Sequence, residues 1–204
     1  MTLQVASTGA KKSLSKEDIL SLDDYRACRD QLRKDIVALK QPRRIDVGPH
    51  ATFYFENYAT MKQQIQEMLY IEKGGDEQLE DELEAYNPMI PQGDELTVTL
   101  MFEIDNPQIR LKTLLQLTDV ELTTYVSVNG EKAYAKPEQE VERTAADGKT
   151  SSVHFLHFPF TAAQIAAFNA PDSEVILGIE HENYAHMTVL GHETKASLAA
   201  DFDA

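Results

Sequence analysis

The chain has 204 residues, and its 42% apolar content is enough to fill a core of domain size. The formal net charge of -15 argues against nucleic acid or an anionic membrane surface as a partner, because binding to either requires a basic face on the protein. The single cysteine, Cys28, excludes an intramolecular disulfide and a four-cysteine metal site within the chain. Together with the lack of a signal-peptide pattern and of a long apolar run, this predicts a cytoplasmic protein.

The N-terminal half is predicted to be mainly helical. Residues 1–13 are expected to form a disordered tail, and residues 14–204 a single α+β domain with an alternative seam near residue 92. Ser15 and Asp18 predict a capped helical turn, and the apolar spacing predicts a helix over residues 23–40. Short strands are expected at 45–47 and 51–57, before a helix for which Thr60 and Gln63 give a capping-box pattern.

The C-terminal half reads as strand, helix, three strands, helix and strand. The strands are predicted at residues 96–104, 122–128, 131–135, 152–160 and 174–180, and the helices at 107–117 and 162–168. This order is typical of two split βαβ halves around a hairpin. We therefore expect an α+β fold in which the N-terminal helices and a short hairpin pack on a mixed sheet, with a ferredoxin-like or related C-terminal half.

Common catalytic signatures do not occur in the chain. It has no GxGxxG, Walker A, GxSxG or HExxH motif, which leaves scattered histidines and carboxylates as candidates. His154 and His157 have the HxxH spacing, but they fall on a predicted strand. Alternation places their side chains on opposite faces, so at most one of them can be a metal ligand, and a hydrogen-bonded structural histidine is the alternative.

Two glutamates on the predicted helix after Thr60 suggest a polar or metal cluster. Glu72 falls on the apolar stripe of this helix, whereas Glu67 lies on the opposite side. A carboxylate on an apolar stripe needs a partner, although exposure at the helix end would also explain Glu72. His181 ends a strand, where both functional sites and ordinary exposed polar residues occur.

Several blocks of sequence carry a resemblance to a known family. They read GPHATFYFENYATMKQQIQEMLYIE, AYNPMIPQGDEL, SSVHFLHF and GIEHENY, and in this order they resemble the bacterial domain-of-unknown-function family 3501 over residues 14–184. The matching positions are His50, Glu56, Asn57, Gln64, Gln66, Glu67, Glu72, Asn87, Pro88, Pro91, His154, His181 and Tyr184. The chain departs from the family pattern at Tyr70 and His157, where arginine is expected, and at Glu182, where proline is usual.

The resemblance implies an accessory role in redox or peroxide handling, because such proteins tend to be encoded beside rubrerythrin-like and iron–sulfur proteins. The main prediction is a cytoplasmic accessory or binding protein of such a redox system, with a rubrerythrin-like or iron–sulfur partner or a second copy of itself. A metal-assisted enzyme and a structural or interaction subunit are the alternatives. The predicted ligand-binding residues are His50, Glu56, Asn57, Gln64, Glu67, Asn87 and Tyr184. The predicted ligands to non-haem iron or another divalent metal are His154, His181, Glu67 and Glu72.

Overall fold

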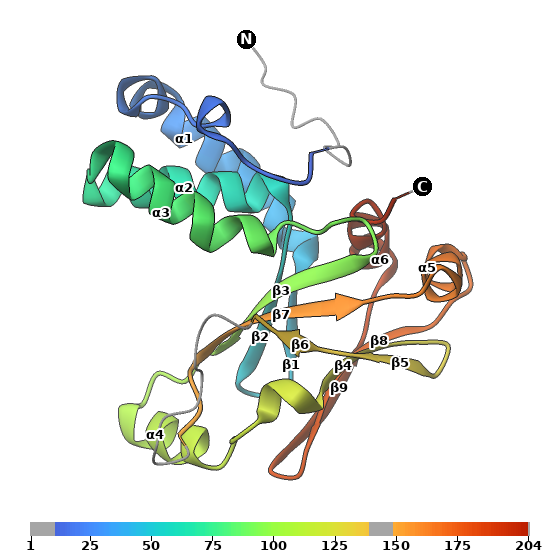
Figure 1. Cartoon of the computed structure of the whole chain (residues 1–204). Coiled ribbons are helices and arrows are strands. Elements are labelled where there is room, and N and C mark those ends of the chain that lie inside the picture. The colour runs from blue at the N-terminus through green and yellow to red at the C-terminus, as the bar shows by residue number, and fades with distance from the viewer. Residues whose placement is uncertain (1–10, 139–148, 204) are drawn as a thin grey trace.

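Two antiparallel sheets and several helices make up the computed structural model, which describes residues 11–138 and 149–203 (Figure 1). The helices are α1 (Leu22–Lys40), α2 (Tyr58–Glu72), α3 (Gly75–Tyr86), α4 (Pro107–Leu115), α5 (Ala162–Asn169) and α6 (His192–Ala199). The strands are β1 (Arg44–Val47), β2 (Ala51–Glu56), β3 (Glu95–Phe102), β4 (Thr124–Val128), β5 (Glu131–Tyr134), β6 (Lys136–Pro137), β7 (Val153–Pro159), β8 (Val175–His181) and β9 (Tyr184–Val189). Short 3-10 turns lie at Lys16–Asp18, Gln41–Arg43, Asn87–Met89 and Val120–Thr123.

The larger sheet has the order β1-β2-β3-β7-β6, and it presents two different faces. Alternate side chains such as Phe53, Leu100 and Leu156 are fully buried in the main core. The intervening positions, which include Tyr54, Thr99 and Phe155 in one cross-strand row, lie on the opposite side, which we call the outer face. The alternation in the sequence therefore decides which side chains meet the core and which meet the helices.

The smaller sheet has the order β5-β4-β8-β9 and shares the main core with the inner face of the larger one. Val126 and Leu177 are paired across β4 and β8 and belong to the same apolar cluster as Phe53. Helices α5 and α6 close one end of this core with an aromatic group formed by Phe160, Phe168 and Phe202. The two sheets are thus held together by one continuous set of apolar contacts.

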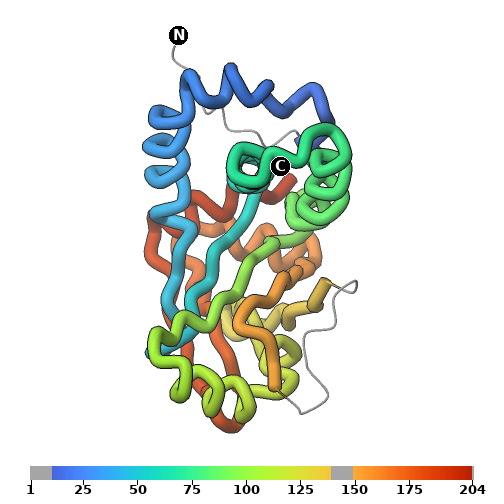
Figure 2. Tube along the Cα trace, turned by 90° about the vertical axis from the view of Figure 1, so that its left-hand side faces the viewer, coloured from blue at the N-terminus to red at the C-terminus, as the bar shows by residue number. Residues whose placement is uncertain are grey.

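Helices α1, α2 and α3 lie together at one end of the molecule, and α4 lies at the opposite end (Figures 1 and 2). A second apolar cluster joins the helices to the larger sheet through Met61 and Ile65 of α2, the turn residue Met89, and Phe155 on the outer face. Helix α1 packs on the other side of α2. As a consequence, α2 is covered on both sides, and part of the outer face lies beneath helices.

The α+β class predicted from the sequence is confirmed, whereas the ferredoxin-like detail and the mixed sheet are not. Every strand pair in the described part is antiparallel, and β3 and β8, which a split βαβ unit would place in one sheet, lie in different sheets. The reason is that β2 and β7 occupy the two edges of β3. Strand β9 was not predicted, because its mostly exposed residues give no apolar alternation.

Helix α2 begins earlier than its predicted cap. Asn57 is the N-cap, with its Oδ1 accepting from the Thr60 amide at 3.0 Å, while Thr60 Oγ1 accepts from the Asn57 amide at 2.8 Å. The capping box is therefore formed by Asn57 and Thr60 rather than by Thr60 and Gln63. By contrast, the predicted turn at Ser15 and Asp18 is confirmed, with a capping box.

The predicted N-terminal tail falls only partly within the described residues. Residues 1–10 lie outside them, and so do residues 139–148. Lys12 donates hydrogen bonds to the Gln92 carbonyl at 2.6 Å and to Asp203 at 2.7 Å. None of the described helices combines the length and the apolar character needed to cross a membrane.

Candidate functional site

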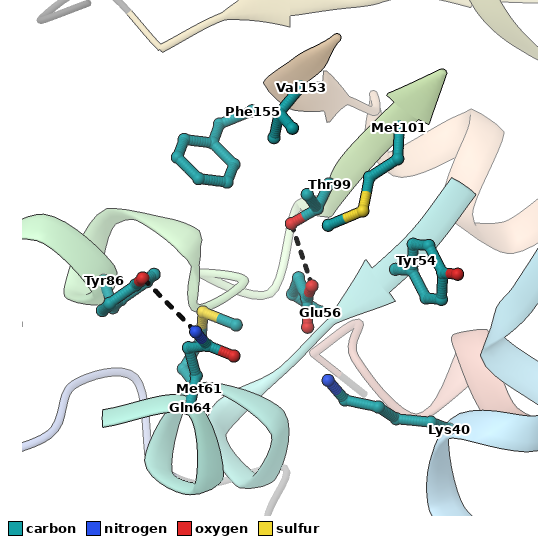
Figure 3. Close-up of a pocket in the computed structure, with 10 residues that line it drawn as sticks. All are labelled: Lys40, Tyr54, Glu56, Met61, Gln64, Tyr86, Thr99, Met101, Val153 and Phe155. Carbon is teal, nitrogen blue, oxygen red and sulfur yellow. Dashed lines mark hydrogen bonds between the residues drawn. The ribbon is translucent and has the colours of Figure 1, made fainter. Parts of the chain in front are cut away.

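A pocket of about 400 Å³ lies between the outer face of the larger sheet and the ends of the three N-terminal helices (Figure 3). This volume is in the range found for small-molecule sites. Its lining combines aromatic and thioether side chains with a few polar groups. The lining residues are Lys40, Tyr54, Glu56, Met61, Gln64, Tyr86, Thr99, Met101, Val153 and Phe155.

The strand side of the pocket follows directly from period-two alternation. Tyr54 and Glu56 project from β2 to the outer face, Thr99 and Met101 do so from β3, and Val153 and Phe155 from β7. The helix side comes from three separate elements: Met61 and Gln64 lie about one turn apart on α2, Tyr86 ends α3, and Lys40 ends α1. The pocket therefore exists only where these elements meet.

Glu56 is the most unusual residue of the pocket. Its side chain is only 4% exposed, and its Oε1 accepts a hydrogen bond from Thr99 Oγ1 at 2.9 Å (Figure 3). The second carboxylate oxygen, Oε2, is buried and has no hydrogen-bond partner among the described residues. Because a buried carboxylate oxygen without a donor is costly, this atom marks a place where a further donor would be stabilising.

The backbone beneath Glu56 is held in place by a buried arginine. Arg43 is 2% exposed and donates to the carbonyl oxygens of Phe55 and Glu56, both at 3.0 Å, and it also pairs with Asp201. These contacts connect the end of β2 to the C-terminal segment after α6. The backbone that carries the Glu56 side chain is therefore held by these hydrogen bonds to Arg43.

Lys40 supplies the second charge of the pocket. It is the last residue of α1, is half-buried, and points toward Glu56 (Figure 3). It forms no ion pair or hydrogen bond with any residue that the structure describes. The pocket thus contains one carboxylate and one ammonium group that do not bind each other directly.

The remaining polar groups are neutral hydrogen-bonding groups. Gln64 Nε2 donates to the Tyr86 hydroxyl at 3.4 Å, and the Tyr54 hydroxyl donates to Glu103 at 3.0 Å. Burial raises the pKa of Tyr86 above its ordinary value, and it is also the main cause of the raised pKa of Tyr54. Both phenols therefore stay protonated at neutral pH and act as hydrogen-bond donors or acceptors rather than as bases.

Of the predicted ligand-binding residues, the structure brings Glu56 and Gln64 together in this pocket. Asn57 instead caps α2. Glu67 faces α1, where it accepts hydrogen bonds from Tyr25 and from Arg29, whose Nε and Nη2 lie 2.9 and 2.7 Å from its carboxylate oxygens. Hydrogen bonding to the Arg29 guanidinium lowers the pKa of Glu67 below its ordinary value. Burial acts in the opposite direction but is outweighed. Glu67 thus has a complete set of partners at the junction of two helices.

Asn87, His50 and Tyr184 also have structural contacts in this molecule. The Asn87 side chain accepts from the Leu14 amide at 2.6 Å and donates to the Leu14 carbonyl at 3.0 Å. The Tyr184 hydroxyl accepts from the backbone amides of His50 and Ala51 at 2.9 and 3.0 Å. These bonds attach the N-terminal segment to the turn after α3, and β9 to the β1–β2 turn.

The four predicted metal ligands lie in different environments. His154 is buried on the inner face of β7, with Nε2 2.9 Å from the Ser151 carbonyl oxygen. His181 Nε2 donates to the Thr118 carbonyl at 3.0 Å, and its Nδ1 accepts from the Asn183 amide at 3.2 Å. Glu72 is exposed at the end of α2, away from the Arg29 contact of Glu67. Within residues 11–138 and 149–203, no three histidine, cysteine or carboxylate side chains are placed to hold one metal ion.

Several pocket residues did not emerge from the sequence. Tyr54 shares the alternation of Thr52 and Glu56, so its position on the outer face could be found from the pattern alone. The pattern does not place Lys40 and Tyr86 in the pocket, because each ends a helix and reaches the pocket only through the packing of α1 and α3. Thr99 and Phe155 have a signal of the same kind as Tyr54, but only after β2, β3 and β7 are known to be adjacent.

Fold and pocket together define an α+β protein in which the ends of N-terminal helices and one face of an antiparallel sheet form a small open pocket. The chain belongs to the family described as protein of unknown function DUF3501, which matches residues 13–202. This confirms the resemblance seen in the sequence. The chain is also similar to a novel protein of unknown function from Burkholderia pseudomallei, solved by crystallography at 1.90 Å resolution. The identity is 34%, the TM-score is 0.87, and the match covers 94% of this chain and 100% of that one. A search of curated proteins gave no match.

Proposed function

We propose that the protein binds a small organic molecule in the pocket on the outer face of the larger sheet. The observation that carries this proposal is the buried Oε2 atom of Glu56, which has no donor within the described residues. A ligand that donates a hydrogen bond to this atom would supply the missing partner. The compensation is worth about 1 to 3 kcal/mol for a typical buried polar group, and more where charge is involved.

The composition of the pocket supports the same proposal. Met61, Met101, Val153 and Phe155 provide apolar surface, and a few polar groups such as Glu56 and Gln64 are interspersed among them (Figure 3). Ligand sites commonly combine a predominantly apolar lining with a small number of polar groups that fix orientation. This arrangement fits the predicted role of an accessory or binding protein.

The other elements of the sequence-based hypothesis remain predictions. A link to a rubrerythrin-like or iron–sulfur redox system, bound non-haem iron, a cytoplasmic location and self-association rest on the resemblance and on composition. The alternatives of a metal-assisted enzyme and an interaction subunit are likewise predictions. Ligand binding in the pocket is compatible with each of these roles and can be tested without deciding among them.

Filling the pocket is the most direct test. Met101 is half-buried in the lining, so Met101→Trp should occupy part of the cavity and weaken binding at least about tenfold. The measurement is ligand-observed NMR with a library of small organic fragments, followed by titration of the hits. Met187→Trp is the matched control, because Met187 is 64% exposed on β9 in the other sheet.

Fragments that bind the wild type and Met187→Trp, but not Met101→Trp, would support the proposal. It would be overturned if no fragment bound the folded wild type, or if all hits bound Met101→Trp with unchanged affinity. Amide shifts in a labelled sample give a second measurement, since a ligand in this pocket should perturb the signals of Glu56 and Gln64.

A further inference from the structure

We infer that the ligand is a free zwitterionic amino acid with an apolar side chain, held by Glu56 at its ammonium end and by Lys40 at its carboxylate end. This inference rests on the proposed function, because it names the chemical class of the molecule that occupies the same pocket. It depends on three features: the opposite charges of Glu56 and Lys40 in the lining, the missing partners of both groups within the described residues, and the apolar side chains that complete the lining.

The charged groups that line the described pocket are Glu56 and Lys40, so the formal charge of the lining is zero. A ligand with a single positive charge would satisfy Glu56 but would be placed near the Lys40 ammonium. A ligand with a single negative charge would be placed near the buried carboxylate. Like-charge juxtaposition is unfavourable in a partly desolvated site, so a molecule that carries one charge of each sign fits best.

Glu56 is suited to bind an ammonium group. Its Oε2 atom is buried and lacks a donor, while Oε1 is already engaged by Thr99. An ammonium group has three donors and could bond to Oε2 and to a neighbouring neutral acceptor. Gln64 offers such an acceptor, because its Nε2 donates to Tyr86 and its carbonyl oxygen remains for a ligand.

Lys40 is suited to bind the carboxylate. Its flexible stem ends in an ammonium group that points to the same part of the pocket as Glu56 and has no ion-pair partner within the described chain (Figure 3). An α-amino acid carries its two charged groups on one carbon atom. One molecule can therefore lie between these two side chains and satisfy both, which neither an amine nor an acid does alone.

The apolar residues of the lining indicate that the side chain of the ligand is apolar. Met61 and Met101 are unbranched and adaptable, so they can adjust to aliphatic or aromatic groups, and Phe155 offers an aromatic surface. When the ammonium and carboxylate groups of the ligand bind Glu56 and Lys40, its side chain would contact the apolar residues of the lining. This arrangement favours leucine, methionine and phenylalanine over polar amino acids.

Isothermal titration calorimetry with matched compounds tests the inference. Leucine is compared with 3-methylbutylamine, which lacks the carboxylate, and with 4-methylpentanoate, which lacks the ammonium group. Phenylalanine is compared with phenethylamine and 3-phenylpropanoate in the same way. The amino acids are expected to bind at least about tenfold more tightly than either analogue, because each analogue leaves one of the two pocket charges without a partner.

Two variants test which side chain binds the ammonium group of the ligand and which binds its carboxylate. Glu56→Gln should weaken the amino acids and the amines, whereas Lys40→Met should weaken the amino acids and the acids. Since Lys40 is only half-buried at a helix end, Lys40→Met keeps the test decisive even if Glu56→Gln does not fold. The matched controls are Glu131→Gln and Lys112→Met, two exposed positions outside the pocket, and neither should change any affinity.

If the amine and the amino acid bound equally well and Lys40→Met had no effect, the inference of a zwitterionic ligand would be wrong. The pocket would still be a ligand site. The same conclusion would follow if other fragments competed for the pocket but no amino acid bound. If neither fragments nor amino acids bound the folded wild type, the proposed function itself would fail. Failure of the zwitterionic ligand and failure of the proposed function therefore give different results in one set of experiments.

Discussion

His157 has a carboxylate on each side of its imidazole ring. Its Nδ1 is 3.0 Å from Glu95 Oε2, and its Nε2 is 3.0 Å from Glu138 Oε2. Burial acts to lower the pKa of His157, but the hydrogen bonds and charges of the two glutamates outweigh it, so the pKa lies above its ordinary value of 6.5. Only the protonated ring can donate to both carboxylates at once.

The raised pKa makes a definite prediction about pH. The contribution of His157 to stability should be fully present below pH 6.5, the ordinary value, and should be lost as the pH rises through the folded-state pKa. His157→Gln should therefore cost about 1 to 3 kcal/mol at pH 5.5 and clearly less at pH 9. Urea unfolding at the two pH values measures this difference, with the exposed His192→Gln as the control. An equal loss at both pH values would contradict it.

At the scale of elements, the contact between α1 and α2 is organised around one buried aromatic residue and one ion pair. Tyr25 of α1 is fully buried, and its hydroxyl donates to Glu67 of α2. Arg29 lies one turn later and binds the same carboxylate through two nitrogens. Since α1 ends at Lys40, the position of this helix also decides where the pocket ammonium lies.

Breaking this pair should loosen α1. Arg29→Met is expected to lower the free energy of unfolding at pH 7 by more than a surface substitution does, because it leaves the Glu67 carboxylate partly unpaired. The pKa of Glu67 is lowered in the folded protein, so the contribution is present above its ordinary value of 4.5 and is lost as the pH falls through the folded-state pKa. The wild type and the variant should therefore converge in stability at strongly acidic pH.

Chemical denaturation at pH 7 and pH 3 measures this convergence. Arg26→Met is the matched control, because Arg26 pairs with Asp23 in water on the exposed side of α1. Its effect should stay within about 1 kcal/mol at either pH. A loss for Arg29→Met no larger than that of the control would show that the pair contributes little to the helix contact.

At the scale of the whole molecule, the two sheets are joined at one edge by the Tyr184 hydroxyl. It accepts from two backbone amides of the β1–β2 turn and donates to the Val47 carbonyl at 2.8 Å. Thr188 Oγ1 adds a bond of 2.7 Å to the Asp46 carbonyl. Gly48 in the same turn has φ +70°, and a Cβ there would lie 2.6 Å from the His186 ring, so the turn and β9 fit closely.

Removing this one hydroxyl should have a large effect. Tyr184→Phe leaves the backbone groups of Val47 and Ala51 without their partner, at a cost of about 2 to 4 kcal/mol. Thermal or urea unfolding measures the loss. Tyr134→Phe is the control, since its hydroxyl binds Glu180 at an exposed site. A similar small change in both variants would mean that the edge contact is dispensable.

The sequence was informative where periodicity was sufficient. The alternation of Phe53 and Phe55 with Tyr54 and Glu56 correctly separates the core from the outer face, and the Asn129-Gly130 hairpin is present between β4 and β5. The strand order was not predictable in the same way. Local pattern does not show which strand occupies an edge, and β2 pairs with β3 although α2, α3 and the following turns separate them in the chain.

The residues of the candidate site were also only partly predictable from the sequence. Glu56 and Gln64 were among the predicted ligand-binding residues that match the family pattern, yet the same set also contained Glu67 and Asn87, which have structural partners. Sequence reveals that a buried polar group needs a partner, but it does not show whether another element of the chain supplies it. That distinction depends on tertiary contacts, such as the one between Arg29 and Glu67.

The contact of Lys12 with Asp203 has a consequence for how the chain can be rearranged. The two residues are 191 positions apart, yet their side chains meet at 2.7 Å, and the Asp203 amide also bonds to the Gly93 carbonyl. A short peptide could therefore connect these ends, with new termini opened between Asn129 and Gly130, where a Cβ on Gly130 would meet nothing within 4 Å. Such a circular permutant would keep every strand pairing and place the pocket residues of β7 ahead of those of β2 and β3 in the chain.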